Sequence, residues 1–92
     1  MNGIAAKTPY DISRDISRNV RNLRKARKIS LKRLSEISGV SYGSLKRFES
    51  TGEIALKSLL KVAVVLDCTD TFTELFSVNK PQTLQDIIDG KA

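Results

Sequence analysis

The stretch SGVSYGSLKRFESTGE, residues 38–53, has two dissimilar sides when it is drawn as a helix. One side carries Leu45 and Phe48, the kind of apolar pair that a helix packed on a core requires. The other side carries residue types that a core does not require: Tyr42, Gly43, Lys46 and Arg47. Arginine can donate two hydrogen bonds to a guanine, and lysine can bind a phosphate of the DNA backbone. This second side therefore indicates a helix that enters a groove of DNA.

The charge of the chain is unevenly distributed. The 92 residues form at most one small domain, and a hydrophobic content of 40% allows a packed core. Residues 1–62 carry 14 Lys and Arg against five Asp and Glu, a net charge of +9, whereas residues 63–92 carry −3. A basic body with an acidic end favours a polyanionic partner on one side of the molecule over ordinary surface charge.

Several classes of function are disfavoured by what the sequence lacks. There is no histidine, so the commonest zinc ligand and the usual neutral-pH acid–base group are missing. The single cysteine, Cys68, is expected to be a small buried hydrophobe and is compatible with a reducing cytoplasm. The longest apolar run, VAVVL, is far too short to cross a bilayer. We therefore expect a cytoplasmic protein with no enzymatic activity, metal, cofactor or membrane partner.

Helical periodicity runs through the whole chain, and no segment alternates as a strand does, so an all-α fold is expected. Ser30 and Ser41 are good N-caps, and Gly39 and Gly52 are good helix stops. The predicted helices span residues 11–27, 31–38, 42–50, 56–66 and 71–76, with a last amphipathic turn or two within 83–89. Residues 1–10 are expected to form an arm, 11–78 the domain, and 79–92 a tail.

The expected packing of these helices rests on a few apolar positions. In the helix over 56–66, the side expected to face inward consists of Leu56, Leu59, Ala63 and Leu66. Residues 31–50 match a helix-turn-helix pattern, with small Ser35 allowing two helices to approach and Gly39 making the turn. Leu34 anchors the first helix of the pair. The second helix is anchored by Val40, Leu45 and Phe48.

The sequence VRNLRKARKISLKRLSEISGVSYGSLKRFE, followed by LLKVAVVL, resembles the phage-repressor-like helix-turn-helix family of the Cro/C1 or Xre type. The resemblance covers about residues 16–76. It implies a compact five-helix, lambda-repressor-like domain that binds double-stranded operator DNA as a homodimer, represses transcription and belongs to a bacterium or phage. A palindromic operator follows from the two-fold symmetry of such a dimer.

The resemblance also implies roles for individual residues. Base reading falls on Tyr42, Gly43 and Arg47, and phosphate contacts fall on Ser41, Ser44 and Lys46. The family pairs an arginine late in its first helix with a glutamate late in its third, here Arg24 and Glu49. Both residues border apolar positions, where a charge needs a partner, so the sequence supports the same pair.

Three further cations are expected to contact phosphates. Lys32 and Arg33 lie in the first turn of a helix, where the helix dipole disfavours cations unless an anion binds nearby. Lys57 likewise lies in the first turn of the helix predicted over residues 56–66.

Three features depart from the family. Leu31 stands where a glutamine often begins the second helix, and Ser35 stands where alanine is usual. The turn after the recognition helix reads STGEIAL and carries acidic Glu53, where asparagine and basic residues are common.

Two apolar groups are expected to form the dimer or partner interface. Within the domain they are Val64, Val65, Phe72 and Phe76, although core packing is expected to use some of these. In the tail they are Leu84, Ile87 and Ile88.

The segment YGSLKRFESTGEIALKSLL also resembles the HipB-like antitoxins, which are encoded beside a kinase-like toxin. Two functions thus remain open: a dimeric repressor of its own operon, or an autorepressor that also binds a toxin protein.

Overall fold

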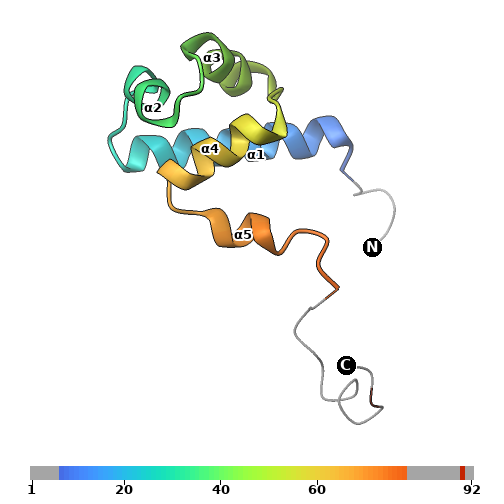
Figure 1. Ribbon diagram of the computed structural model, residues 1–92. Helices are drawn as coiled ribbons and strands as arrows, with labels where there is room; N and C mark the ends of the chain where they lie inside the picture. Colours follow the sequence, from blue (N-terminus) through green and yellow to red (C-terminus); the bar gives the residue numbers. More distant parts are fainter. Residues whose placement is uncertain (1–6, 79–89, 91–92) are drawn as a thin grey trace.

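The fold of the described residues, 7–78 and 90, is entirely helical in a computed structural model, which confirms the expected all-α class. The helices are α1 (Pro9–Ala26), α2 (Leu31–Ser38), α3 (Tyr42–Thr51), α4 (Leu56–Val65) and α5 (Thr69–Thr73). Helices α2 and α3 lie on one side of α1 and α4, and α5 lies on the opposite side (Figure 1). Among the described residues, no helix combines the length and apolar character needed to cross a membrane.

The ends of α2 and α3 follow from local capping chemistry, as the sequence predicts. The Ser30 hydroxyl accepts a hydrogen bond from the Arg33 N–H at 3.0 Å, and Ser41 caps α3 in the same way. Each helix then ends at a glycine with left-handed backbone, φ 79° at Gly39 and φ 84° at Gly52. These signals place the beginning of α3, and therefore the orientation of its exposed face.

The first helix begins two residues earlier than expected. Thr8 caps α1 and exchanges two hydrogen bonds with Asp11, each 3.1 Å long, in a capping box. Pro9 occupies the first helical position, where its missing N–H costs nothing. Pro9 and Tyr10 therefore belong to α1 and not to the N-terminal arm, and the expected start at Asp11 is corrected.

The fifth helix also differs from its expected span of 71–76. Asp67 takes a left-handed φ of 55°, and the Cys68 N–H bonds the Ala63 carbonyl at 3.0 Å, so the chain turns tightly enough for α5 to begin at Thr69. The helix ends at Thr73, and Phe76 has a φ of 60° that no helix permits. The side chain of Phe76 is fully exposed. The amphipathic turn predicted within 83–89 lies outside the described residues.

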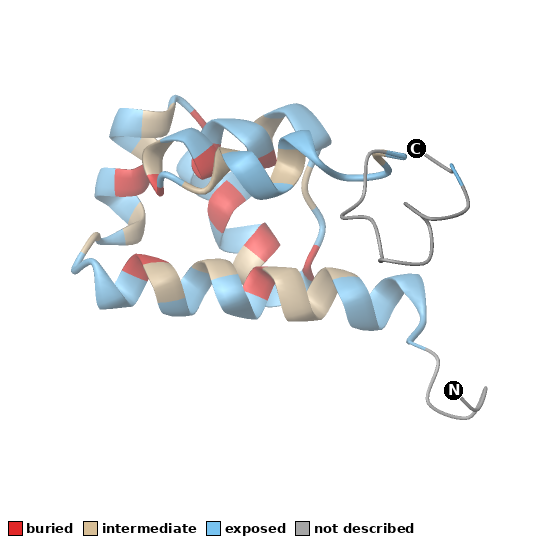
Figure 2. Ribbon diagram, turned by 90° about the horizontal axis from the view of Figure 1, so that it is seen from below, coloured by how far each residue is buried: buried red, intermediate tan, exposed pale blue. Residues whose placement is uncertain are grey.

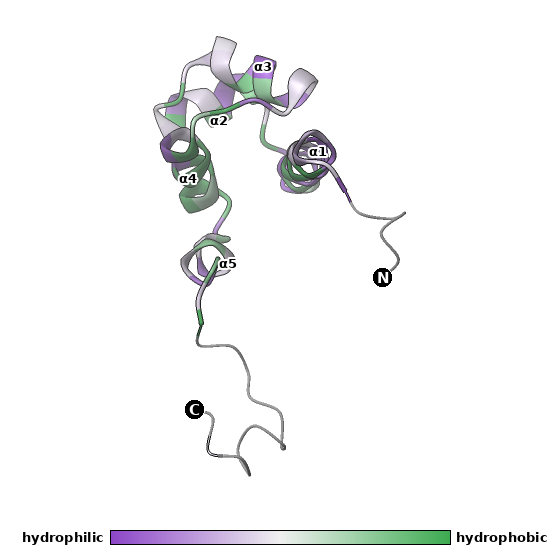
Figure 3. Ribbon diagram, turned by 90° about the vertical axis from the view of Figure 1, so that its right-hand side faces the viewer, coloured by the Kyte–Doolittle hydropathy of each residue, from purple (hydrophilic) through white to green (hydrophobic). Residues whose placement is uncertain are grey.

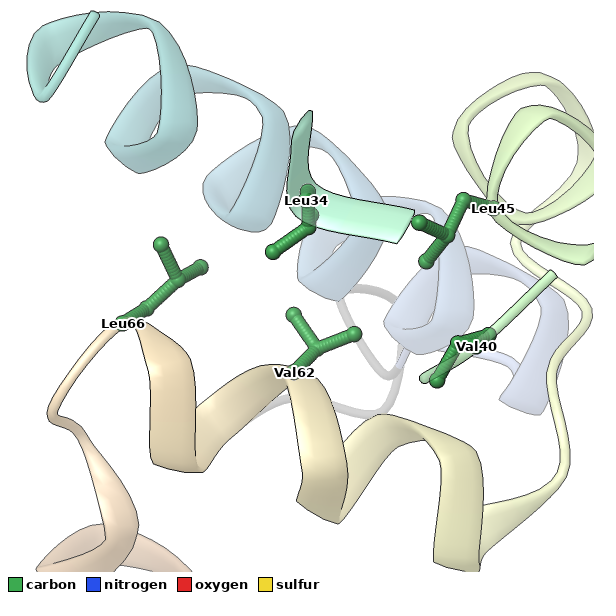
Figure 4. Close-up of a cluster of buried hydrophobic side chains, with 5 residues drawn as sticks. All are labelled: Leu34, Val40, Leu45, Val62 and Leu66. Atoms are coloured by element: carbon green, nitrogen blue, oxygen red, sulfur yellow. The ribbon is translucent and has the colours of Figure 1, made fainter. Parts of the chain in front are cut away.

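The core lies between α2, the α2–α3 turn, α3 and α4. Its central cluster consists of Leu34, Val40, Leu45, Val62 and Leu66, whose side chains converge in Figure 4. Phe48, Leu59 and Ala63 are buried as well, and Figure 2 shows the buried positions gathered where the helices face one another.

One expected core position on α4 is wrong. The buried face of this helix follows Leu59, Val62, Ala63 and Leu66, the spacing of a single helical stripe. Leu56, at the first position of α4, is 65% exposed and borders a hollow of about 170 Å³. Val62, which the sequence did not assign to the inward side, is buried instead, with 1% of its surface exposed.

Candidate nucleic-acid interface

The turn between α2 and α3 holds the two helices at a defined angle. The Ser35 hydroxyl donates a hydrogen bond to the Val40 carbonyl at 2.6 Å, and the Val40 N–H donates to the Ser38 hydroxyl at 3.1 Å. The Val40 side chain is buried in the core cluster. Ser35 is therefore more than a small residue, because its hydroxyl ties the end of the turn back to α2.

An almost buried ion pair fastens α3 to α1. Arg24 donates two hydrogen bonds to the Glu49 carboxylate, from Nε at 2.8 Å and from Nη2 at 3.0 Å. Its Nη1 donates to the Ile29 carbonyl at 2.8 Å, so one guanidinium joins α1, α3 and the segment before α2. The two side chains are only 10% and 12% exposed. The structure thus brings together the two residues that the sequence pairs, and the bidentate geometry satisfies both charges.

The outward face of α3 presents the residues that the sequence assigns to base reading. Tyr42 is 49% exposed, and Gly43 and Arg47 are exposed as well. A Cβ atom added to Gly43 would meet nothing within 4 Å, so neither packing nor backbone conformation requires glycine there. Glycine within a helix costs roughly 0.5–1 kcal/mol relative to alanine. No contact within the folded protein offsets this loss of helix stability at Gly43.

The two serines assigned to phosphates bond each other. The Ser41 hydroxyl accepts from the Ser44 N–H at 3.1 Å and donates to the Ser44 hydroxyl at 2.8 Å. Ser41 is therefore used as the N-cap of α3. Because Ser44 accepts in this bond, its own hydroxyl proton remains available for an outside acceptor such as a phosphate oxygen.

The remaining cations assigned to phosphates lie on α2, on α3 and in the first turn of α4. Lys32, Lys46 and Lys57 are exposed, and Arg33 makes a surface ion pair of 3.4 Å with Glu36. Lys57 lies in the first turn of α4, whose N-cap, Ala55, provides no side-chain hydrogen bond. Between α3 and this end of α4 is an open hollow of about 370 Å³, lined by Ser44, Arg47, Glu53, Ile54, Ala55 and Ser58.

Sequence reasoning missed the partner of Arg47. Its Nη2 donates a hydrogen bond to Oε1 of Glu53, six residues on, across the glycine that ends α3. Helical spacing cannot show this contact because Glu53 lies beyond the helix. The one feature of the sequence that could have pointed to this contact is the acidic Glu53 itself, at a position where the resembled family often has asparagine or a basic residue. Sequence reasoning also missed Arg14 on α1, whose Nη1 donates a hydrogen bond to the Ser50 carbonyl.

An apolar surface lies on α4 and α5, away from α3. It consists of Leu60, Val64 and Phe72, which line a shallow hollow of about 360 Å³ together with two threonines, and we call it the α4–α5 surface. Val64 is 66% exposed. Figure 3 shows that α4 is apolar along most of its length, so it has apolar residues left over once one side is buried.

Only part of the expected interface lies on this surface. The structure brings Val64 and Phe72 together, whereas Val65 is partly buried and packs against the core cluster. Phe76 is exposed beyond the end of α5, next to two exposed residues that the sequence reading did not select, Leu75 and Val78. The remaining expected positions, Leu84, Ile87 and Ile88, lie outside the described residues.

Comparison of the sequence with protein-family models matches residues 19–81 to the Cro/C1-type HTH DNA-binding domain. This match spans about two thirds of the chain and includes all of α2, α3 and α4. Searches of the curated proteins and of the solved structures find no match. In the described part of the chain, no three or more His, Cys, Asp or Glu side chains gather as a metal site would require.

Proposed function

The chain belongs to the Cro/C1-type helix-turn-helix DNA-binding family, and we propose that it is a sequence-specific repressor of its own operon. The observation that carries the proposal is the exposed face of α3. It combines a helix fixed at both ends, a glycine that packing does not require and an arginine with several free donors. These properties support a surface that binds DNA.

In this mechanism α3 lies in the major groove, which admits one helix and presents a distinct hydrogen-bonding pattern for each base pair. Arg47 donates to O6 and N7 of a guanine, a contact worth roughly 1–3 kcal/mol of discrimination. Tyr42 contacts a thymine methyl or a phosphate, and Gly43 lets the backbone approach the bases. Phosphate contacts, which set the register without reading sequence, come from Lys32, Arg33, Ser44, Lys46 and Lys57.

The proposal is tested by titrating the protein against the duplex from upstream of its own gene, with a random duplex as control, at two salt concentrations. We expect tighter binding of the upstream duplex and a loss of affinity for both as salt rises. Arg47→Ala is expected to reduce the difference in binding free energy between the upstream and the random duplex by about 1–3 kcal/mol. Lys46→Ala serves as the matched control, because a lost phosphate contact weakens both duplexes equally. Equal binding of the two duplexes by the wild-type protein would refute sequence-specific recognition.

We also propose that the protein binds DNA as a homodimer that buries the α4–α5 surface. One domain of this size makes a small interface with DNA, and a two-fold dimer reads two half-sites about 34–36 Å apart. The α4–α5 surface supports this arrangement because it is apolar, partly hollow and on the side away from α3. In such a dimer, both recognition helices remain free to face the DNA.

Sedimentation of two aspartate variants tests the dimer. Val64→Asp is expected to shift the protein to monomer, because a charge would be buried against apolar side chains. Leu56→Asp is the matched control, since Leu56 lies on the same helix with nearly the same exposure, 65% against 66%. A dimer that survives Val64→Asp, or dissociates equally in both variants, would show that another surface mediates association.

An antitoxin is the second candidate function. It would use the same DNA surface and would bind a kinase-like toxin protein through a further apolar site. The observation that favours it is a second exposed apolar group past α5, Leu75, Phe76 and Val78, which are 53%, 102% and 98% exposed. Co-expression with the product of the adjacent gene tests this alternative. Co-purification that Phe76→Ser abolishes would support an antitoxin, and no complex would favour a repressor that acts alone.

A further inference from the structure

The contact between Arg47 and Glu53 is built into the backbone around it. The Thr51 hydroxyl donates to the Arg47 carbonyl at 2.7 Å and accepts from the Glu53 N–H at 3.1 Å. The two residues are therefore joined twice, once through their side chains and once through Thr51. Gly52 between them is buried, and a Cβ there would lie 3.1 Å from the backbone of Ser13 on α1. The turn that carries Glu53 is consequently fixed relative to α3.

Stability of the free protein does not account for this arrangement. The side chains of Arg47 and Glu53 are 68% and 64% exposed, and exposed ion pairs contribute little to folding. A carboxylate beside a surface that binds phosphates also weakens association, because like charges meet across the interface. The remaining physical explanation is that Glu53 fixes the position of the Arg47 guanidinium.

We propose that Glu53 is a positioning residue that sets the DNA specificity of Arg47. Its carboxylate accepts from Nη2 alone, so most of the five guanidinium N–H donors stay free for a guanine. Holding the long side chain in one place before binding lowers the entropy lost in the groove. The same carboxylate keeps Arg47 from turning to a nearby phosphate, a contact that would strengthen binding to any sequence. This inference rests on the proposed sequence-specific binding.

The test compares Glu53→Gln with wild type on the upstream and the random duplex over a range of salt concentrations. We expect the ratio of the two affinities to fall about 3- to 10-fold, the equivalent of ordering one long side chain. Binding to the random duplex should tighten, and its salt dependence should steepen by about one phosphate contact, because Arg47 becomes free to reach the backbone.

Glu36→Gln is the matched control. Glu36 is also an exposed glutamate paired with an arginine, Arg33, and its substitution changes the net charge by the same amount. Since Arg33 is assigned to a phosphate, this variant should tighten both duplexes equally and leave the ratio unchanged. In an Arg47→Ala background, Glu53→Gln should no longer alter the ratio, because no guanidinium remains to be positioned.

The outcomes separate the two proposals. If wild type discriminates between the duplexes and Glu53→Gln changes both affinities by the same factor as Glu36→Gln, Glu53 acts only through its charge and the inference is overturned. An unchanged effect of Glu53→Gln in the Arg47→Ala background overturns it as well. If wild type does not discriminate at all, the proposed function fails, and the positioning role fails with it.

Discussion

Replacing Gly43 with alanine should stabilise the fold and weaken binding to the operator. Gly43 lies in the first turn of α3, and its missing Cβ faces open space. Alanine at a position whose backbone it tolerates stabilises a protein by about 0.4–1 kcal/mol, chiefly by restricting the unfolded chain. For a domain of this size, that gain corresponds to a rise in melting temperature of about 2–8 °C.

The effect of Gly43→Ala on DNA binding should have the opposite sign. The added methyl group would stand between the backbone of α3 and the bases, next to exposed Tyr42. We expect a loss of about 10-fold in affinity for the upstream duplex, comparable to one mismatched base pair. Thermal unfolding followed by circular dichroism measures the first effect, and fluorescence anisotropy of the labelled duplex measures the second.

Asn19→Ala is the control for this experiment. Asn19 is an exposed residue of α1 beside α5, on the side of the molecule away from α3. Alanine there should raise the melting temperature through helix propensity alone and leave the affinity unchanged. If Gly43→Ala stabilises the fold without weakening binding, Gly43 does not lie against the groove. If it destabilises the fold, the reading of this site as an open helical position is wrong.

Three further predictions concern the scaffold. Arg24→Met should destabilise the fold by about 3–5 kcal/mol in urea unfolding because the Glu49 carboxylate loses its partner, and adding Glu49→Leu should restore most of the loss. Gly52→Ala should lower the melting temperature more than Gly39→Ala; both have positive φ, but only a Cβ at Gly52 meets backbone within 4 Å. The pKa of Asp15 lies below its ordinary 3.8 because Lys7, and then Arg18, donate hydrogen bonds to it. Its stabilising contribution is therefore present above pH 3.8 and lost as pH falls through the folded-state pKa, which an NMR titration of the carboxyl group would show.

The accuracy of the sequence-based predictions differs from helix to helix for identifiable reasons. The limits of α2 and α3 could be predicted because serine caps and stop glycines encode them locally. The inward face of α4 was predicted less well, with Leu56 in place of Val62. Seven of the ten residues in LKSLLKVAVV are apolar, so the pattern contains little contrast between the two sides of the helix. Contacts with α2 and α5, rather than the pattern, decide which of these residues are buried.

Some features of the candidate site could likewise be predicted from the sequence, and others could not. Residues of α3 could be assigned to its exposed face because helical spacing relates them to Leu45 and Phe48. The contact of Glu53 with Arg47 could not be predicted from spacing, because a left-handed glycine between them reverses the chain. Gly43 and Glu53 nevertheless share a property that the sequence does reveal. One costs helix stability and the other opposes phosphate binding, so neither is explained by the free protein. Both are explained if α3 lies against base pairs, where a close backbone and an oriented arginine are required.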